Sequence, residues 1–246
     1  MGEVCAPPFR EDAPMNRLLT KTKTILKNLI IARLAIGAAM AIGAGLWLSD
    51  PDSQRTGWEI PKAIAVGALV ALGAIRVWYA LRVTATIKKR YAQRDRLPQA
   101  LAQLGFLVPL LWVGSPVLDF ADYPSNGGML VVGTLCYAAG IWVCYRSHAD
   151  LGQGLSPTLD IKSGHTLITA GIYRRIRHPM YLGFLVFTLG QALVVSNFVA
   201  GFSGLFGMLL LLALRVHREE QMMLDEFGDE YAAYCERTSR LLPGIW

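Results

Sequence analysis

The chain has 246 residues, of which 53% are hydrophobic and only 17% charged, and its formal net charge is +6. The apolar residues come in runs of roughly 20, the length of a membrane-spanning helix, which argues against an ordinary soluble domain. Basic residues in a membrane protein usually mark cytoplasmic loops, so we expect membrane lipids and no nucleic acid among its partners. The four cysteines show no paired spacing, so the sequence indicates neither a disulfide framework nor a metal site.

The N-terminal tail, residues 1–24, is polar and basic and lacks the apolar core and cleavage site of a signal peptide. Beyond it the sequence predicts an all-α integral membrane protein with about six transmembrane helices. The predicted spans cover residues 26–48, 60–81, 101–118, 129–145, 181–195 and 198–216. We divide the chain into the tail, a scaffold of four spans over 25–145, and a region over 146–246 that carries the chemistry.

The connections between the spans differ in charge. Basic residues gather in the N-terminal tail, the second and fourth connections and the C-terminal tail, whereas the first and third connections hold mostly acids, with Arg55 as the exception. The positive-inside rule therefore places both termini in the cytoplasm. The two longest polar segments, residues 148–179 and the tail after Val216, lie on that side, and long loops commonly carry function.

The fourth connection contains "TLDIKSGHTLIT", which alternates around a Ser-Gly turn and predicts a small hairpin or two extended strands. Farther along, Pro179 disfavours helix at His178 and suits the first turn of the fifth span. His178 would then lie at a helix N-terminus, where free N–H groups and the helix dipole favour an anion. The nearby arginines could assist such an anion, or they could only hold the loop at the lipid surface.

The sixth span continues into a polar segment, "RVHREE". Helical spacing puts Arg215, Glu219 and Met222 on one face. The Arg–Glu pair could be a surface pair worth ~0.3–0.5 kcal/mol, or it could line a cavity, since polar groups at membrane depth are costly and commonly functional. Glu220 lies ~100° around the helix from Glu219, so we do not expect both to face one pocket.

These segments resemble a known family. "HTLITAGIYRRIRHPMYLG", "RVHREE" and "EFGDEYAAYCERTSRLLP" are similar, in order and spacing, to the isoprenylcysteine carboxyl methyltransferase family, whose relatives include phospholipid methyltransferases. The resemblance covers roughly residues 146–243. It implies a methyltransferase that uses S-adenosylmethionine without a Rossmann fold and acts on a lipophilic acceptor from the bilayer. It also implies a multi-pass location with a cytoplasmic active site, and we expect a bacterial inner membrane.

The resemblance also implies the site. Glu219 would hold the cationic end of the cofactor and Arg215 would face the substrate, and these two are the expected catalytic residues. The expected cofactor-binding residues are His165, Thr166, Leu167, Ile168, Tyr173, His178, Pro179, Met180, Tyr181, Glu219 and Glu220.

Two other functions remain open at this point. Membrane sterol reductases, which use NADPH, carry a similar Arg-His-Pro-x-Tyr-x-Gly motif that an acid usually follows, whereas Phe184 follows Gly183 here. A transporter would spread polar residues through several spans, and the middle spans here are nearly free of acids. The acceptor also stays open: a prenylcysteine carboxylate, a lipid phenol, a quinone-like compound, a phospholipid amine or a small thiol. The sequence does not indicate an oligomeric state.

Several single residues have simpler interpretations. We expect His148 and His217 to be interfacial histidines, and Tyr231, Tyr234 and Phe227 to form the packing face of a last amphipathic helix. Arg76, near the cytoplasmic end of its span, could pair inside the bundle, but we favour its extension toward the lipid surface.

Overall fold

The computed structural model describes residues 59–82, 87–90, 96–151, 160–162 and 166–242. These residues belong to one compact unit, Gly43–Trp246. The N-terminal tail, the predicted first span and His165 lie outside the described residues, so their predictions stay untested.

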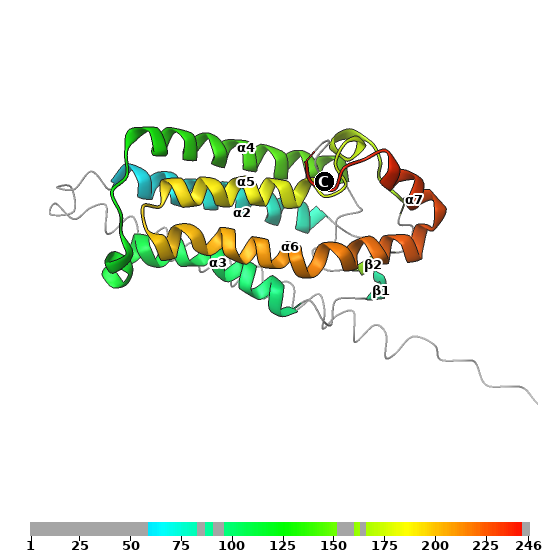
Figure 1. The fold of residues 1–246 in the computed structure, drawn as a ribbon, viewed down its shortest axis with the longest axis horizontal. Helices are drawn as coiled ribbons and strands as arrows, with labels where there is room; N and C mark the ends of the chain where they lie inside the picture. The colour runs from blue at the N-terminus through cyan, green and yellow to red at the C-terminus, as the bar shows by residue number, and fades with distance from the viewer. Residues whose placement is uncertain (1–58, 83–86, 91–95, 152–159, 163–165, 243–246) are drawn as a thin grey trace, which may run out of the picture. The chain divides into compact units, whose positions relative to one another are not determined.

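The described chain is mostly helical, as the sequence predicts (Figure 1). Five long helices carry the predicted spans and a short one follows: α2 (Glu59–Arg82), α3 (Arg96–Gly114), α4 (Gly127–Leu151), α5 (Pro179–Val194), α6 (Phe198–Phe227) and α7 (Asp229–Glu236). Two 3-10 helices and two strands join them: η3 (Pro116–Ala121), η5 (Gly171–Arg174), β1 (Ile87–Arg90) and β2 (Asp160–Lys162).

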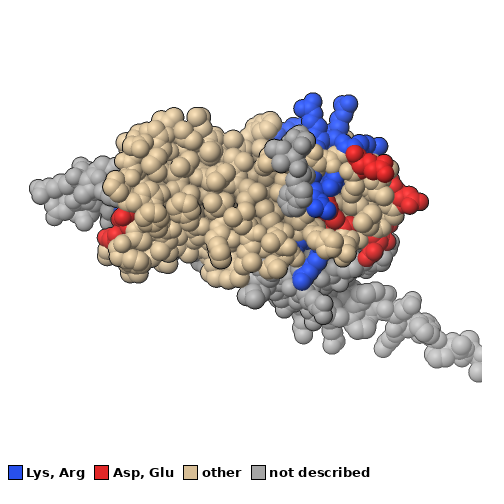
Figure 2. Space-filling model, viewed as in Figure 1, with Lys and Arg blue, Asp and Glu red and all other residues tan. Residues whose placement is uncertain are grey.

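Three of these helices, α2, α4 and α6, are long and apolar enough to cross a bilayer, and α3 and α5 contribute shorter apolar helices. Figure 2 shows a broad band without Lys, Arg, Asp or Glu across one face of the molecule, with charged side chains gathered at its ends. This distribution suits a protein embedded in a membrane. The count of six spans stays a prediction, because three helices among the described residues meet the length and hydropathy of a full span.

The predicted hairpin in the fourth connection is wrong. Strand β2 pairs antiparallel with β1, which lies more than 60 residues earlier, with Arg90 opposite Asp160. Residues 166–169 are irregular. The alternating pattern identified an extended segment correctly, but local alternation does not specify the partner of a strand.

Helices α4 and α5 pack with their backbones in close approach. A Cβ atom on Gly140 of α4 would lie 2.7 Å from the backbone nitrogen of Phe187, and one on Gly183 of α5 would lie 2.7 Å from the sulfur of Cys144. Small residues are what permit such closeness between membrane helices. The contact fixes the start of α5, where the predicted site lies, against the end of α4.

Helices α5 and α6 form the tight hairpin that the sequence predicts. Asn197 caps α6, because its Oδ1 accepts a hydrogen bond from the backbone N–H of Ala200 at 2.8 Å. Its amide nitrogen donates to the carbonyl of Leu118 at 2.5 Å and to Asp122 Oδ1 at 2.7 Å. One side chain thus joins the hairpin to η3, at the end of the helices opposite α7.

Candidate active site

The site begins at the N-terminus of α5, as the sequence predicts. His178 is the N-cap residue, with φ −121° and ψ 56°, and Pro179 occupies the first helical position. The backbone N–H of His178 donates to the carbonyl of Arg240 at 2.9 Å. The Nε2 atom of the buried His178 ring has no hydrogen-bond partner among the described residues. It lies 3.4 Å from Glu220 Oε1, within ion-pair range, so a carboxylate is already its neighbour.

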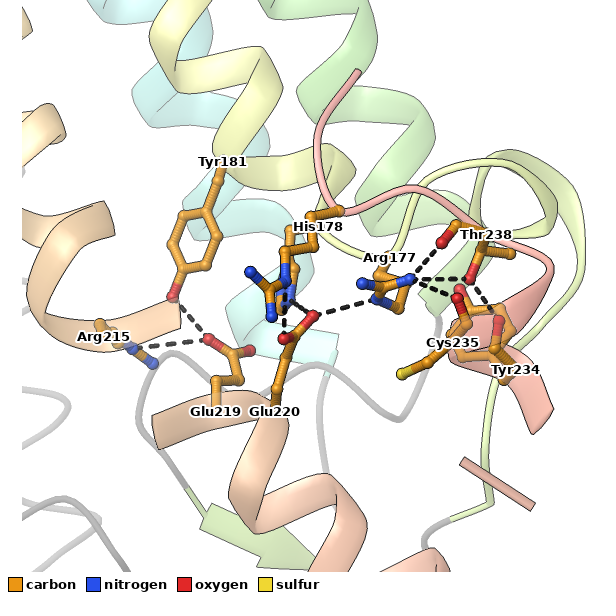
Figure 3. A network of polar contacts seen from close by, with 10 residues as sticks. Arg177, His178, Tyr181, Arg215, Glu219, Glu220, Tyr234, Cys235 and Thr238 are labelled. Carbon is orange, nitrogen blue, oxygen red and sulfur yellow. Dashed lines mark hydrogen bonds and ion pairs between the residues drawn. The ribbon is translucent and has the colours of Figure 1, made fainter. Parts of the chain in front are cut away.

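Glu219 lies at the centre of a small polar cluster beside α5 (Figure 3). The hydroxyl of Tyr181 donates to Glu219 Oε2 at 2.6 Å, and Arg215 Nε lies 3.7 Å from the same oxygen. The Arg215 side chain is 8% exposed and that of Glu219 is 28% exposed. A surface i,i+4 pair would leave both groups in solvent, so the burial of Arg215 favours the cavity-lining interpretation of this pair.

Glu220 faces a different set of partners. Its Oε1 accepts from Arg177 Nε at 3.0 Å and its Oε2 accepts from Arg240 Nε at 2.8 Å. His178 Nε2 lies 3.4 Å from Oε1, within ion-pair range but without hydrogen-bond geometry. Both carboxylate oxygens are therefore engaged by arginines, which favours a structural role for Glu220, and the cofactor-binding role expected from the resemblance stays a prediction. The ~100° separation of adjacent helical residues explains why Glu219 and Glu220 differ.

Arg177 ties the C-terminal tail to the start of α5. Its Nη1 donates to the carbonyl of Cys235 at 2.9 Å and to the carbonyl of Thr238. Ser239 also forms a parallel backbone bridge with Ile176. The tail therefore runs directly beside the residues that precede His178, as Figure 3 shows for Thr238.

Sequence reasoning treated Arg177 as one loop arginine among several and gave Arg240 no role. The available signal was the Glu219–Glu220 pair. Adjacent acids on one helix point in different directions, and the acid whose side chain is buried in the protein needs a cation as its partner.

Tyr173 lies in η5 and is buried, and its hydroxyl bonds to the backbone of α4. It donates to the carbonyl of Ser147 at 3.3 Å, and its own carbonyl accepts from the Tyr234 hydroxyl at 2.6 Å. Burial raises the pKa of Tyr173, and burial raises the pKa of Tyr234 to about 12, so both phenols stay neutral donors. The Tyr173 hydroxyl is thus used to hold the loop against α4.

Acidic Asp150 fixes the beginning of η5. It accepts a hydrogen bond from the backbone N–H of Ile172 at 2.8 Å and pairs with Arg146 at 3.0 Å. Gly171 has φ 63°, and a Cβ there would lie 2.2 Å from the Asp150 carboxylate. Glycine is therefore required at this turn on both conformational and steric grounds.

The remaining predicted cofactor-binding residues differ in burial and backbone structure. Pro179 is buried at the helix start and Met180 packs against the core. Thr166, Leu167 and Ile168 form irregular backbone before η5, and Thr166 is exposed. The cofactor-binding role of these residues stays a prediction.

The structure places the residues for which the sequence predicts a purely structural role. Tyr231 and Tyr234 are buried in the packing face of α7, as predicted. His217 is exposed, but His148 is 2% exposed and its Nδ1 lies 2.7 Å from the carbonyl of Cys144, so its predicted interfacial position is wrong. Arg76 is half-buried and lies over the ring of Phe184, so it makes a contact inside the bundle, and its extension toward the lipid surface stays a prediction.

Comparisons with known proteins show which family the chain belongs to. The protein-S-isoprenylcysteine O-methyltransferase A of Arabidopsis thaliana is 30% identical over 161 residues, which cover 65% of this chain and 76% of the plant protein. The chain belongs to the isoprenylcysteine carboxyl methyltransferase family. The phospholipid methyltransferase family matches this chain over residues 129–230, from α4 to the start of α7.

Other members of the isoprenylcysteine carboxyl methyltransferase family are also similar to the chain. The Schizosaccharomyces pombe protein-S-isoprenylcysteine O-methyltransferase is 32% identical over 118 residues, 46% of this chain and 48% of the yeast protein. A solved structure of the eukaryotic intramembrane Ras methyltransferase ICMT matches with a TM-score of 0.48 and 16% identity, over 82% of this chain and 71% of that one.

Membership of this family identifies the chain as an integral-membrane methyltransferase, which removes support from the reductase and transporter hypotheses. The matched relatives named above are eukaryotic, so a bacterial inner membrane stays a prediction.

Proposed function

We propose that this protein transfers a methyl group from S-adenosylmethionine to the carboxylate of a prenylcysteine-type lipid acceptor. The observation that carries the proposal is the position of Glu219, a partly exposed carboxylate held between Tyr181 and the buried Arg215. The names of the related methyltransferases support the choice of acceptor.

The residues present fit the cofactor. Its amino group and sulfonium are cationic, and Glu219 offers a carboxylate that is 28% exposed in an otherwise buried cluster. Its carboxylate end is anionic and suits the N-terminus of α5, which begins at Pro179. The cationic groups of the cofactor would thus face Glu219 on α6, and its carboxylate would face the N-terminus of α5.

Each residue has a separate task in this proposal. Tyr181 orients the Glu219 carboxylate through its short hydrogen bond, and Arg215 directs the acceptor carboxylate. When bound, S-adenosylmethionine would supply the methyl group: a carboxylate oxygen of the acceptor forms a bond to the methyl carbon, and the electrons of the broken S–C bond stay on the sulfur of the cofactor. A carboxylate acceptor has no proton to lose, so the protein needs no general base. Its contribution is to position the two reactants and exclude water.

The orientation of the protein forms part of the proposal. The polar cluster lies at the end of the helices where α7 and the basic residues of η5 gather, and the positive-inside rule places that end in the cytoplasm. The cofactor would then arrive from the cytoplasm and the lipophilic acceptor from the bilayer.

The test is methyl transfer by the purified protein in lipid nanodiscs, with methyl-labelled cofactor and a synthetic farnesylcysteine. We expect saturable formation of a methyl ester, recognised by release of labelled methanol in base. Label in a base-stable product from a phenol, amine or thiol acceptor, with none from the carboxylate, would refute the proposed acceptor. Tyr181→Phe should lower kcat/KM by about tenfold, because losing a hydrogen bond to a charged group costs ~1.5–3 kcal/mol.

A further inference from the structure

The backbone of the C-terminal tail pairs with the segment that leads from η5 into α5. The N–H of Ser239 donates to the carbonyl of Arg175 at 3.2 Å, and the carbonyl of Ser239 accepts from the N–H of Arg177 at 2.8 Å. The carbonyl of Arg240 accepts from the N–H of His178, the N-cap of α5, at 2.9 Å. These bonds satisfy backbone groups that would otherwise need water, so the tail helps to set the path of the chain into α5.

Tyr234 of α7 adds a side-chain contact to the same segment. Tyr234 is 3% exposed, and its hydroxyl donates to the carbonyl of Tyr173 at 2.6 Å. The hydroxyl of Tyr173 donates in turn to the carbonyl of Ser147 on α4 at 3.3 Å. Tyr173 is thereby fixed between α4 and α7. Leaving a buried carbonyl without its donor is costly, so the Tyr234 hydroxyl stabilises this position of the segment.

Tyr234 is itself held in place by its neighbours. Thr238 Oγ1 donates to the carbonyl of Tyr234 at 2.5 Å, and Arg177 Nη1 donates to the carbonyl of Thr238 (Figure 3). The ring of Tyr231 lies 5.9 Å from the ring of Tyr234. Because these contacts already order α7 and the residues after it, the bond to Tyr173 constrains the segment before α5 more than it constrains Tyr234.

The segment that Tyr234 holds carries expected cofactor-binding residues at both ends, Tyr173 and His178. Less than one helical turn beyond His178, Tyr181 bonds Glu219. A displacement of the segment would therefore shift one wall of the proposed cofactor site relative to Glu219. The acceptor is directed from α6 in the proposed function, so its binding should respond less to this displacement.

We propose that Tyr234 is a positioning residue for the cofactor: its hydroxyl keeps residues 173–178 in the conformation that binds S-adenosylmethionine. This inference rests on the proposed function. It extends the site into α7, beyond residue 230, where the match to the phospholipid methyltransferase family ends. Without the hydroxyl, residues 173–178 adopt the binding conformation for a smaller fraction of the time, and the apparent Kd for the cofactor rises by the inverse of that fraction.

The experiment compares Tyr234→Phe with the unaltered protein and with a matched control, Tyr231→Phe, in nanodiscs. Tyr231 also lies on α7 and is 2% exposed, but its hydroxyl interacts with Cys235, so the control removes an equally buried hydroxyl at another contact. Three quantities are measured: the Kd for S-adenosylmethionine, the KM for farnesylcysteine at saturating cofactor, and the melting temperature. Tyr234→Phe should raise the cofactor Kd by about five- to tenfold, because one buried hydrogen bond is lost, and leave the acceptor KM unchanged. Tyr231→Phe should leave the cofactor Kd unchanged.

A purely structural role of Tyr234 would lower the melting temperature without changing the cofactor Kd. An unchanged Kd for Tyr234→Phe, or an equal rise in Kd for both variants, therefore overturns the inference. Should Tyr234→Phe fail to fold, hydrogen exchange of the unaltered protein decides: bound cofactor should slow exchange in residues 173–178 and 234–240 together, and no slowing in 234–240 overturns the inference. Absence of cofactor binding to the unaltered protein overturns the proposed function and the inference together.

Discussion

Replacing Glu220 with glutamine should destabilise the protein strongly while leaving the cofactor bound. The carboxylate and Arg177 are both buried, with side chains 8% and 9% exposed. Removing one partner of a buried ion pair costs ~3–5 kcal/mol, because the other charge stays buried. Arg240 is 34% exposed, so its share is about 1 kcal/mol or less.

Glutamine keeps the size of the side chain and one oxygen acceptor, so the lower part of that range applies. We expect the free energy of unfolding to fall by about 3 kcal/mol, which lowers the melting temperature by roughly 6–12 °C for a chain of this size. The assay is thermal unfolding in nanodiscs, followed by helical circular dichroism. Binding of S-adenosylmethionine is measured in parallel at a temperature where both proteins are folded.

The control is Glu230→Gln, which makes the same change at an exposed position on α7 and should leave the melting temperature unchanged. A double-mutant cycle of Glu220→Gln with Arg177→Met should give a coupling energy of roughly 2 kcal/mol. Two results would refute the division of roles between Glu219 and Glu220. One is a Glu220→Gln variant with the same melting temperature as the unaltered protein, and the other is a folded Glu220→Gln variant that no longer binds the cofactor.

Two further predictions concern the scaffold. Gly140→Ala should lower the free energy of unfolding by ~1–3 kcal/mol in a denaturant titration, because its Cβ would lie 2.7 Å from the backbone nitrogen of Phe187. Gly67→Ala is its control: nothing lies within 4 Å of that Cβ, so the change should be neutral or stabilising by up to about 1 kcal/mol, and equal effects at the two glycines would contradict the helix packing. Asn197→Ala should cost ~1–2 kcal/mol through loss of the α6 cap and of the bond to Leu118, and an unchanged melting curve would count against this junction.

Much of the fold could be predicted because hydrophobic run length is a local property. The runs from residue 60 onward correspond to the five long helices, and Pro179 correctly located the start of α5 at His178. The partner of β2 could not be predicted, because a three-residue strand carries no information about which distant segment it will pair with.

The site was predictable to the same extent. Helical spacing placed Arg215 and Glu219 together, and the structure confirms that proximity. The contribution of the C-terminal tail was not predictable, since Arg240 reaches Glu220 only through the path of the backbone after α7. The partner of Arg76 was not predictable for a related reason: the ring of Phe184, over which its guanidinium lies, comes from another helix, α5.

The most direct test of the cofactor site is the equilibrium binding of S-adenosylmethionine to the purified protein and to its Glu219→Gln variant, with Glu230→Gln as the matched control. The account predicts saturable binding to the unaltered protein and to the control, and a loss of about a hundredfold in affinity for Glu219→Gln, because the variant no longer offers a charged partner to the cation. Equal affinity of all three proteins, or no binding to the unaltered protein, would contradict the placement of the cofactor between α5 and α6.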